Sequence, residues 1–135
     1  MMAICVVAIA AVAGVTSGSA SLTARNVSLT ITFWPDEQIP GTYERWTVRC
    51  NPVGGTLPSR RRACAKLSSL PIASFAPVPK DAICTQIYGG PQKAVVKGKI
   101  GAVRIWSSFR RRNGCEIERW NRVTPWLLPQ GGARS

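Results

Sequence analysis

Cysteine is the residue that most constrains what this chain can fold into. One of its five cysteines, Cys5, lies near the N-terminus, and the other four are Cys50, Cys64, Cys84 and Cys115. An even number of cysteines in an exported chain indicates disulfides, and four cysteines make two bridges with three pairings open. Zinc binding is the alternative, but the chain has no CxxC pair and no histidine, whereas structural zinc sites have closely spaced ligands. We therefore expect two disulfides, no metal and no other cofactor.

The N-terminal segment accounts for the odd fifth cysteine. The first 24 residues carry no charged side chain, and residues 3–15 are almost wholly apolar, a length typical of a signal-peptide core and too short to span a bilayer. Gly18-Ser19-Ala20 supplies the small residues that a signal peptidase prefers. We predict a removable signal peptide over residues 1–20, and hence a secreted, extracellular protein that loses Cys5. No basic residue precedes the apolar stretch, so a buried N-terminal helix is the alternative, and the start and cleavage site stay open.

A length of 135 residues suits one domain. We assign it to residues 21–128 and treat the Pro- and Gly-rich residues 129–135 as a flexible tail. Hydrophobic periodicity, prolines and glycines then predict the local structure. We expect strands at 27–33 and 46–50, a helix from Pro58 to Leu70 that turns Cys64 to the core, an irregular surface connection at 71–79, a hairpin of 94–96 and 100–109 around a turn at 97–99, and a last strand near Leu127 and Leu128.

The absence of histidine also bears on catalysis. It rules out a Ser-His-Asp triad, a Cys-His pair and a histidine general base. Among the six carboxylates, Glu116 and Glu118 would share one face of a strand, an arrangement compatible with a pair of catalytic acids. The neighbouring Arg119 and Arg122 favour solvated charge pairing instead. No phosphate-binding glycine loop or dinucleotide fingerprint is present, so we expect that the protein is not an enzyme.

The charge is strongly unbalanced. Eighteen Lys and Arg against six Asp and Glu give a net charge of +12, which attracts anionic partners without choosing among them. Two triplets concentrate this charge, Arg60-Arg61-Arg62 and Arg110-Arg111-Arg112. The first would splay around a helix and is better explained as a solvated face. Five tryptophans are potential base-stacking platforms, but most lie in alternating segments where core packing explains them better.

One longer segment is more specific than any of these features. Residues 50–67, CNPVGGTLPSRRRACAKL, resemble the signature of the Streptomyces subtilisin inhibitor-like family, in which a Cys-x-Pro, a Gly, a Pro and an Ala-Cys-x-x-Leu recur at this spacing. The matching residues are Cys50, Pro52, Gly55, Pro58, Ala63, Cys64 and Leu67. Leu57 departs from the family, which usually has a histidine there. The resemblance extends over about residues 27–128 and is weakest toward its end.

The resemblance implies a secreted serine protease inhibitor of the α+β class. Its fold would be a five-stranded antiparallel sheet with two helices, with disulfides Cys50–Cys64 and Cys84–Cys115. It further implies a homodimer formed through the sheet. The high charge leaves an alternative function on the same fold, a secreted protein that binds polyanions or the cell surface through Arg60, Arg61, Arg62, Arg110, Arg111 and Arg112.

The resemblance also places a reactive loop in CTQIYGGP, residues 84–91. In it Cys84 anchors the loop, Thr85 precedes the specificity residue, Gln86 is that residue, Ile87 lies across the scissile bond, Tyr88 follows, and Asn113 supports the loop from outside. An uncharged Gln86 favours subtilisin-like over trypsin-like targets, because it would leave the carboxylate of a trypsin-like pocket unpaired. Gly89-Gly90 departs from the family and would loosen the outgoing side of the loop. The alternative is an ordinary strand-ending turn.

Overall fold

A computed structural model describes residue 14 and residues 25–131 of the chain. The predicted signal peptide, apart from Gly14, and residues 132–135 of the predicted tail lie outside the described residues. Among those that are described, no helix has the length and apolar character needed to cross a membrane.

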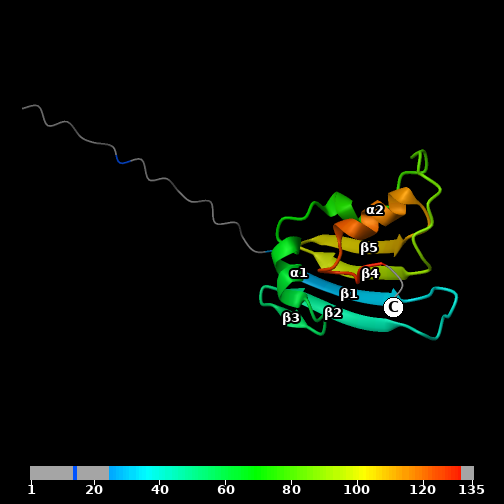
Figure 1. Ribbon diagram of the computed structural model, residues 1–135. Helices are drawn as coiled ribbons and strands as arrows, with labels where there is room; N and C mark the ends of the chain where they lie inside the picture. The colour runs from blue at the N-terminus through cyan, green and yellow to red at the C-terminus, as the bar shows by residue number, and fades with distance from the viewer. Residues whose placement is uncertain (1–13, 15–24, 132–135) are drawn as a thin grey trace, which may run out of the picture.

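Five antiparallel strands and two α-helices make up the described part of the chain (Figure 1). In chain order they are β1 (Val27–Trp34), β2 (Glu44–Cys50), β3 (Gly54–Gly55), α1 (Arg60–Leu67), the 3-10 helix η1 (Ile72–Phe75), β4 (Lys93–Ile100), β5 (Val103–Arg110) and α2 (Gly114–Arg122). The strand order in the sheet is β3-β2-β1-β4-β5. The predicted α+β arrangement of a five-stranded antiparallel sheet, two helices and two disulfides is confirmed.

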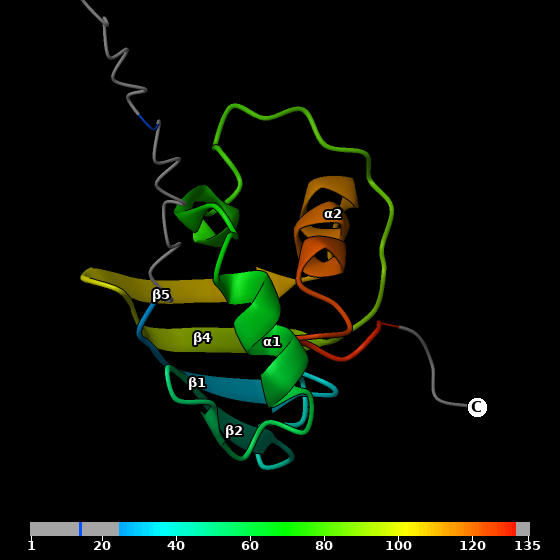
Figure 2. The same cartoon turned by 90° about the vertical axis from the view of Figure 1, so that its left-hand side faces the viewer.

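The core lies on one face of this sheet. Every second side chain of β1 is buried, and inward side chains of the neighbouring strands pack beside them. The helices close this face with Ala63 and Leu67 of α1 and Trp120 of α2, all fully buried. Figure 2 shows α1 crossing over the strands and α2 lying beside β5. The outward side chains of the same strands are exposed or half-buried, so the sheet has one packed face and one open face.

The β4–β5 hairpin turns later than predicted. The expected turn at 97–99 is wrong, because β4 continues to Ile100 and the turn falls at Gly101 and Ala102. Gly101 has φ 58° and suits a tight hairpin turn. Gly98 lies inside the strand instead, where an added Cβ would come within 1.9 Å of the Ser28 carbonyl oxygen. A glycine that permits close strand packing was thus mistaken for a turn glycine.

Residues 114–122 form helix α2, whereas the pairing of Glu116 and Glu118 on one face assumed a strand. Asn113 is the N-cap of α2, and its side-chain oxygen accepts a hydrogen bond of 3.0 Å from the Glu116 amide. Glu116 and Glu118 therefore do not share the face of a strand. The charge pairing expected here is confirmed for Glu118, which forms an i,i+4 ion pair of 2.7 Å with Arg122. An N-cap residue followed three positions later by Glu was the overlooked signal.

Three other local predictions also need correction. Residues 71–79 are not wholly irregular, because η1 forms there and buries Phe75 edge-on against Phe109. Helix α1 ends at Leu67, and Cys64 is only half-buried. Leu127 and Leu128 lie in no strand: both are buried, and both amides donate to the Val123 carbonyl. Adjacent buried residues are incompatible with the alternation of a half-buried strand.

The five tryptophans are not all explained by core packing in strands, as the sequence predicted for most of them. Trp120 and Trp126, the two that are buried, lie outside the strands. Trp46 faces the core and stacks on Phe33. Trp34 and Trp106 take outward positions of β1 and β5, and Trp106 is 79% exposed. Core packing therefore does not explain Trp106.

Two disulfides link separate parts of the fold. Cys50–Cys64 joins the end of β2 to α1, with Cα atoms 5.5 Å apart. Cys84–Cys115 joins residues 84–91 to the first turn of α2, with Cα atoms 5.4 Å apart. Both pairings are those that the family resemblance implies. Disulfides of this kind indicate an oxidising environment.

We expect the double variant Cys50→Ser, Cys64→Ser to fold with lower stability. Opening a 15-residue loop should reduce the free energy of unfolding by about 3 kcal/mol, mainly by freeing the unfolded chain. Urea denaturation followed by tryptophan fluorescence measures this loss. A loss below about 1 kcal/mol would contradict a stabilising role for this bridge.

Candidate functional site

Residues 84–91 form an exposed strap between η1 and β4. Figure 2 shows this chain arching past α2 before it enters the sheet. Residues 85–88 are all exposed. Two large apolar side chains of the strap lie in solvent, Ile87 at 61% and Tyr88 at 62% exposure, and Ile83, just before the strap, is 101% exposed. Apolar side chains grouped in this way on a surface segment indicate an interaction site.

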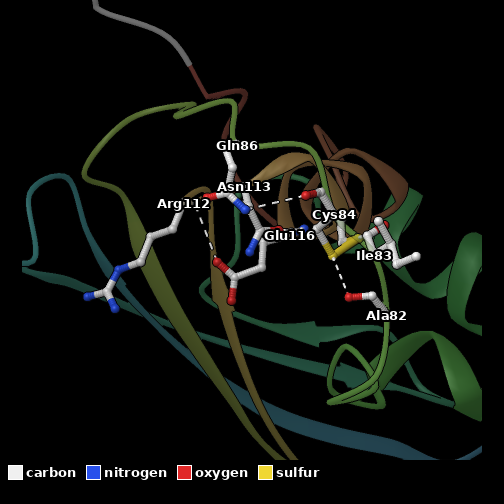
Figure 3. The surroundings of a disulfide bond; sticks show 8 residues. Ala82, Ile83, Cys84, Gln86, Arg112, Asn113 and Glu116 are labelled. Carbon is white, nitrogen blue, oxygen red and sulfur yellow. Dashed lines mark hydrogen bonds between the residues drawn. A yellow bond between two sulfur atoms is a disulfide. The ribbon is translucent and has the colours of Figure 1, made fainter.

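The incoming side of the strap is fixed to the start of α2 (Figure 3). The Cys84–Cys115 disulfide forms one link, and the Gly114 amide donates to the Thr85 carbonyl oxygen at 2.9 Å. A Cβ on Gly114 would come within 2.0 Å of the Thr85 hydroxyl. A glycine at the first turn of α2 therefore allows the strap to approach the helix this closely.

The outgoing side is fixed as well, contrary to the loosening expected from Gly89-Gly90. The Gly89 amide donates to the Arg111 carbonyl at 2.7 Å, and the Arg111 guanidinium donates back to the Gly89 carbonyl. A Cβ on Gly89 would lie 2.8 Å from the Ile117 side chain, and Gly90 has φ 132°. Gly89 thus permits close packing, and Gly90 permits a conformation that other residues rarely adopt.

Three residues lie free between these anchors. No backbone hydrogen bond joins Gln86, Ile87 or Tyr88 to any other residue that the structure describes. The Gln86 side chain rests on its own loop, with Nε2 3.4 Å from the Cys84 carbonyl oxygen (Figure 3). An exposed segment with unpaired backbone groups, held at both ends, can pair with the edge of another protein's strand.

Glu37 supports the strap from the β1–β2 connection. Its amide donates to the Pro91 carbonyl at 2.9 Å, and its carboxylate pairs with Arg110 at 3.0 Å and with Arg112. Burial would raise the pKa of the Glu37 carboxyl, but hydrogen bonds from Arg112 and Arg110 and their charges outweigh burial and hold this pKa below its ordinary value. No sequence pattern pointed to this contact, because Glu37 lies far from the strap along the chain.

All three side chains of the triplet Arg110-Arg111-Arg112 bind other residues of the same chain. Arg110 and Arg112 bind Glu37. Arg111 is only 9% exposed and donates to Gly89 and, at 3.3 Å, to the side-chain oxygen of Gln92. The triplet therefore supports the strap, a role that its sequence pattern did not reveal. The triplet Arg60-Arg61-Arg62 lies on α1, largely in solvent.

Asn113 acts on the strap through α2. Its side-chain oxygen caps the helix by accepting from the Glu116 amide (Figure 3), and the next residue, Gly114, makes the hydrogen bond to Thr85. The structure thus brings together residues 84–88, Asn113 and Cys115. No group of His, Cys, Asp or Glu suited to a metal ion occurs among the described residues.

Neither the family models scanned nor the curated proteins searched match this chain. Any function proposed for the strap must therefore be supported by its own geometry and by the sequence motif.

The contacts of Glu37 with Arg110, Arg112 and Pro91, here called the Glu37 brace, make a testable contribution to stability. A lowered pKa in the folded state means that the ionised carboxylate stabilises the fold above the ordinary pKa of glutamate, and that this stabilisation is lost as pH falls through the folded-state pKa. Glu37→Gln should cost about 1–2 kcal/mol at neutral pH, since Arg112 is half in solvent and its share is screened. The melting temperatures of the wild type and of Glu37→Gln should converge as the pH falls below the ordinary pKa range of glutamate.

Glu118→Gln is the matched control for this measurement. It removes an exposed ion pair to Arg122, and such pairs contribute little. A loss of stability as large for Glu118→Gln as for Glu37→Gln would show that the Glu37 brace has no special role.

Proposed function

We propose that the protein is a secreted inhibitor of serine proteases, not an enzyme, and that it presents the bond between Gln86 and Ile87 as a substrate-like scissile bond. One observation carries this proposal: residues 86–88 are exposed, have free backbone groups and are anchored on both sides. The motif of residues 50–67 points to the same class of protein. The two disulfides fit an oxidising environment, and secretion would follow from the signal predicted at residues 1–20.

Physical chemistry explains why such a strap would inhibit a protease. A protease binds its substrate as an extended strand. A segment already held at Thr85 and Gly89 loses less conformational freedom on binding than a flexible peptide does, so its affinity rises without additional contact area. If the Gln86–Ile87 bond were cleaved, the Cys84–Cys115 bridge would hold the new end at Gln86 near Ile87. Re-formation of the peptide bond could then compete with release of the cleaved inhibitor from the protease.

Gln86 would set the specificity. Its side chain is exposed and makes only a long hydrogen bond of 3.4 Å to its own loop, so turning into a protease pocket costs little. Subtilisin-like proteases have less charged pockets and are the proposed targets. A trypsin-like pocket has a buried carboxylate, which Gln86 would leave unpaired at a cost of several kcal/mol, on the order of 3–5.

Substitution of Gln86 tests the position of the scissile bond. Gln86→Lys should create trypsin inhibition, because the ammonium supplies the missing charge partner. Gln86→Met should strengthen subtilisin inhibition, and Gln86→Pro should abolish both by fixing the backbone at this position. Inhibition constants of these variants and of the wild type against both proteases measure the effect. Equal inhibition by all four proteins would mean that Gln86 does not enter the specificity pocket.

Substitution of Arg111 tests whether anchoring is what makes the strap an inhibitor. Arg111→Met keeps much of the buried volume but removes the donor to the Gly89 carbonyl. Losing a charged hydrogen bond of about 1.5–3 kcal/mol should weaken inhibition roughly ten- to hundredfold and speed cleavage at Gln86. Arg62→Met, on the exposed side of α1, is the control. If Arg111→Met stays folded in a thermal melt and inhibits like the wild type, the anchor has no role in inhibition.

A further inference from the structure

The open face of the sheet carries an unusual set of side chains. We use this name for the outward side chains of β1, β2, β4 and β5, which lie opposite the helices. Two outward residues of β1, Thr30 and Thr32, add hydroxyl groups at its centre. Six cations surround them: Arg45, Arg49, Lys93, Lys97, Lys99 and Arg104.

Strand register arranges these groups in rows across the sheet. Ser28 lies opposite Arg49 on one side and Lys99 on the other, and Lys99 lies opposite Arg104. Neighbouring strands are about 4.8 Å apart, so three cations share one short row. In the next row across the sheet, Thr30 of β1 lies opposite Lys97 of β4, and Lys97 lies opposite Trp106 of β5. The sequence segment KGK at 97–99 is thus part of a charged face and not a turn.

The positive charge of this face is not neutralised within the described part of the chain. The ion pairs found there use Glu37 and Glu118, and none involves the six cations. Arg110, a further outward cation, is the one that Glu37 holds. A solvated surface that served solubility alone would intersperse both signs of charge. Single-sign charge on one face indicates an anionic partner.

The same charge opposes the dimer that the family resemblance implies. A homodimer through the open face would bring six cations of one copy against six of the other, and like charges placed against one another across an interface repel. The open face is therefore suited to a partner of opposite charge better than to a second copy of this chain.

Aromatic side chains narrow the choice of partner. Trp106 is 79% exposed, with the Lys97 ammonium 4.8 Å from its ring centre. A shallow hollow beside it is lined by Lys97, Lys99 and Arg104. At the other end of the face Trp34 lies 6.1 Å from the Tyr43 ring. Exposed aromatic rings among cations are the combination that binds single-stranded nucleic acid, with bases stacked on the rings and phosphates on the cations.

We infer that the open face binds single-stranded nucleic acid. The row of Arg49, Lys99 and Arg104 holds backbone phosphates, and Trp106 stacks a base. This site is separate from the strap. Residues 84–91 enter the sheet at Lys93, and Lys99 lies six residues further along β4, about 20 Å away. Nucleic-acid binding thus goes beyond protease inhibition and does not require it.

The test uses a fluorescein-labelled oligothymidine of about 15 nucleotides and measures fluorescence anisotropy of the secreted, full-length mature protein. The charge variant is Lys99→Gln, Arg104→Gln. Its matched control is Arg61→Gln, Arg62→Gln, which removes the same charge from exposed residues of α1. We expect the charge variant to weaken binding at least tenfold and to reduce the salt slope by about 1.4, for two lost phosphate contacts, while the control stays within about twofold.

Trp106→Ala tests the stacking step. Loss of one stacked base should weaken oligothymidine binding by about five- to hundredfold, and wild-type tryptophan fluorescence should be quenched on binding. Heparin, which is anionic but has no bases, should bind the wild type and Trp106→Ala alike. Subtilisin inhibition by every variant should match that of the wild type, because the strap uses none of these residues. The charge variant and its control should also melt like the wild type, whereas Trp106→Ala should melt slightly lower, because it loses the contact between the ring and the Lys97 ammonium.

Several results would overturn the inference. Equal weakening by the charge variant and its α1 control would mean that net charge alone attracts the oligonucleotide. Unchanged oligothymidine binding by Trp106→Ala would assign the face to polyanions without base contact, and tighter binding of duplex DNA would exclude a single-strand site. A dimer in sedimentation that Trp106→Ala converts to monomer would assign the face to a second copy.

Discussion

The packing of α2 on β5 is the constraint on which the candidate site depends. Trp120 is fully buried against the sheet, and Arg119 reaches across to donate to the Ser108 carbonyl at 3.0 Å and the Ser107 hydroxyl at 2.9 Å. Burial lowers the pKa of the Arg119 guanidinium, a cost partly offset by these hydrogen bonds and by its position 4.5 Å over the Phe109 ring. The first turn of α2 supplies Gly114 and Cys115 to the strap, so a shift of this helix would move the whole loop.

Arginine therefore has two separate uses in this chain. Arg111 and Arg119 are buried and donate mainly to backbone carbonyls and neutral side chains, and Arg110 and Arg112 share Glu37. These four hold the sheet end, α2 and the strap together. A planar guanidinium with five donors can satisfy several carbonyls at once, which explains why arginine fills these positions. The cations of the open face, in contrast, make no ion pair among the described residues.

Sequence patterns predicted features that arise from local periodicity and failed where distant contacts decide. The alternation from Val27 to Phe33 determined β1 and its buried face, and the motif around Cys50 and Cys64 led to the observed disulfide pairing. The hairpin turn was misplaced because, in the sequence, a turn is equally compatible with Gly98 and with Gly101. In the fold, Gly98 packs closely against the Ser28 carbonyl, and Gly101 has no such neighbour. Glu37 and Arg111 could not be assigned to the strap, because their roles depend on contacts between segments far apart in the chain.

The distribution of charge shows which part of the net charge of +12 serves the fold. Like charges on one face repel over about 10 Å at 0.1 M salt, and repulsion of this kind destabilises a compact state. Contacts of Lys97 with Trp106 and of Lys93 with Trp34 offset part of that cost, since each is worth about 0.5–1 kcal/mol at an exposed site. Arg49, Lys99 and Arg104 have no such compensation from an ion pair or a ring. Because the charges of these three side chains have no ion-pair or ring partner within the described chain, they are better explained by an external anion than by folding.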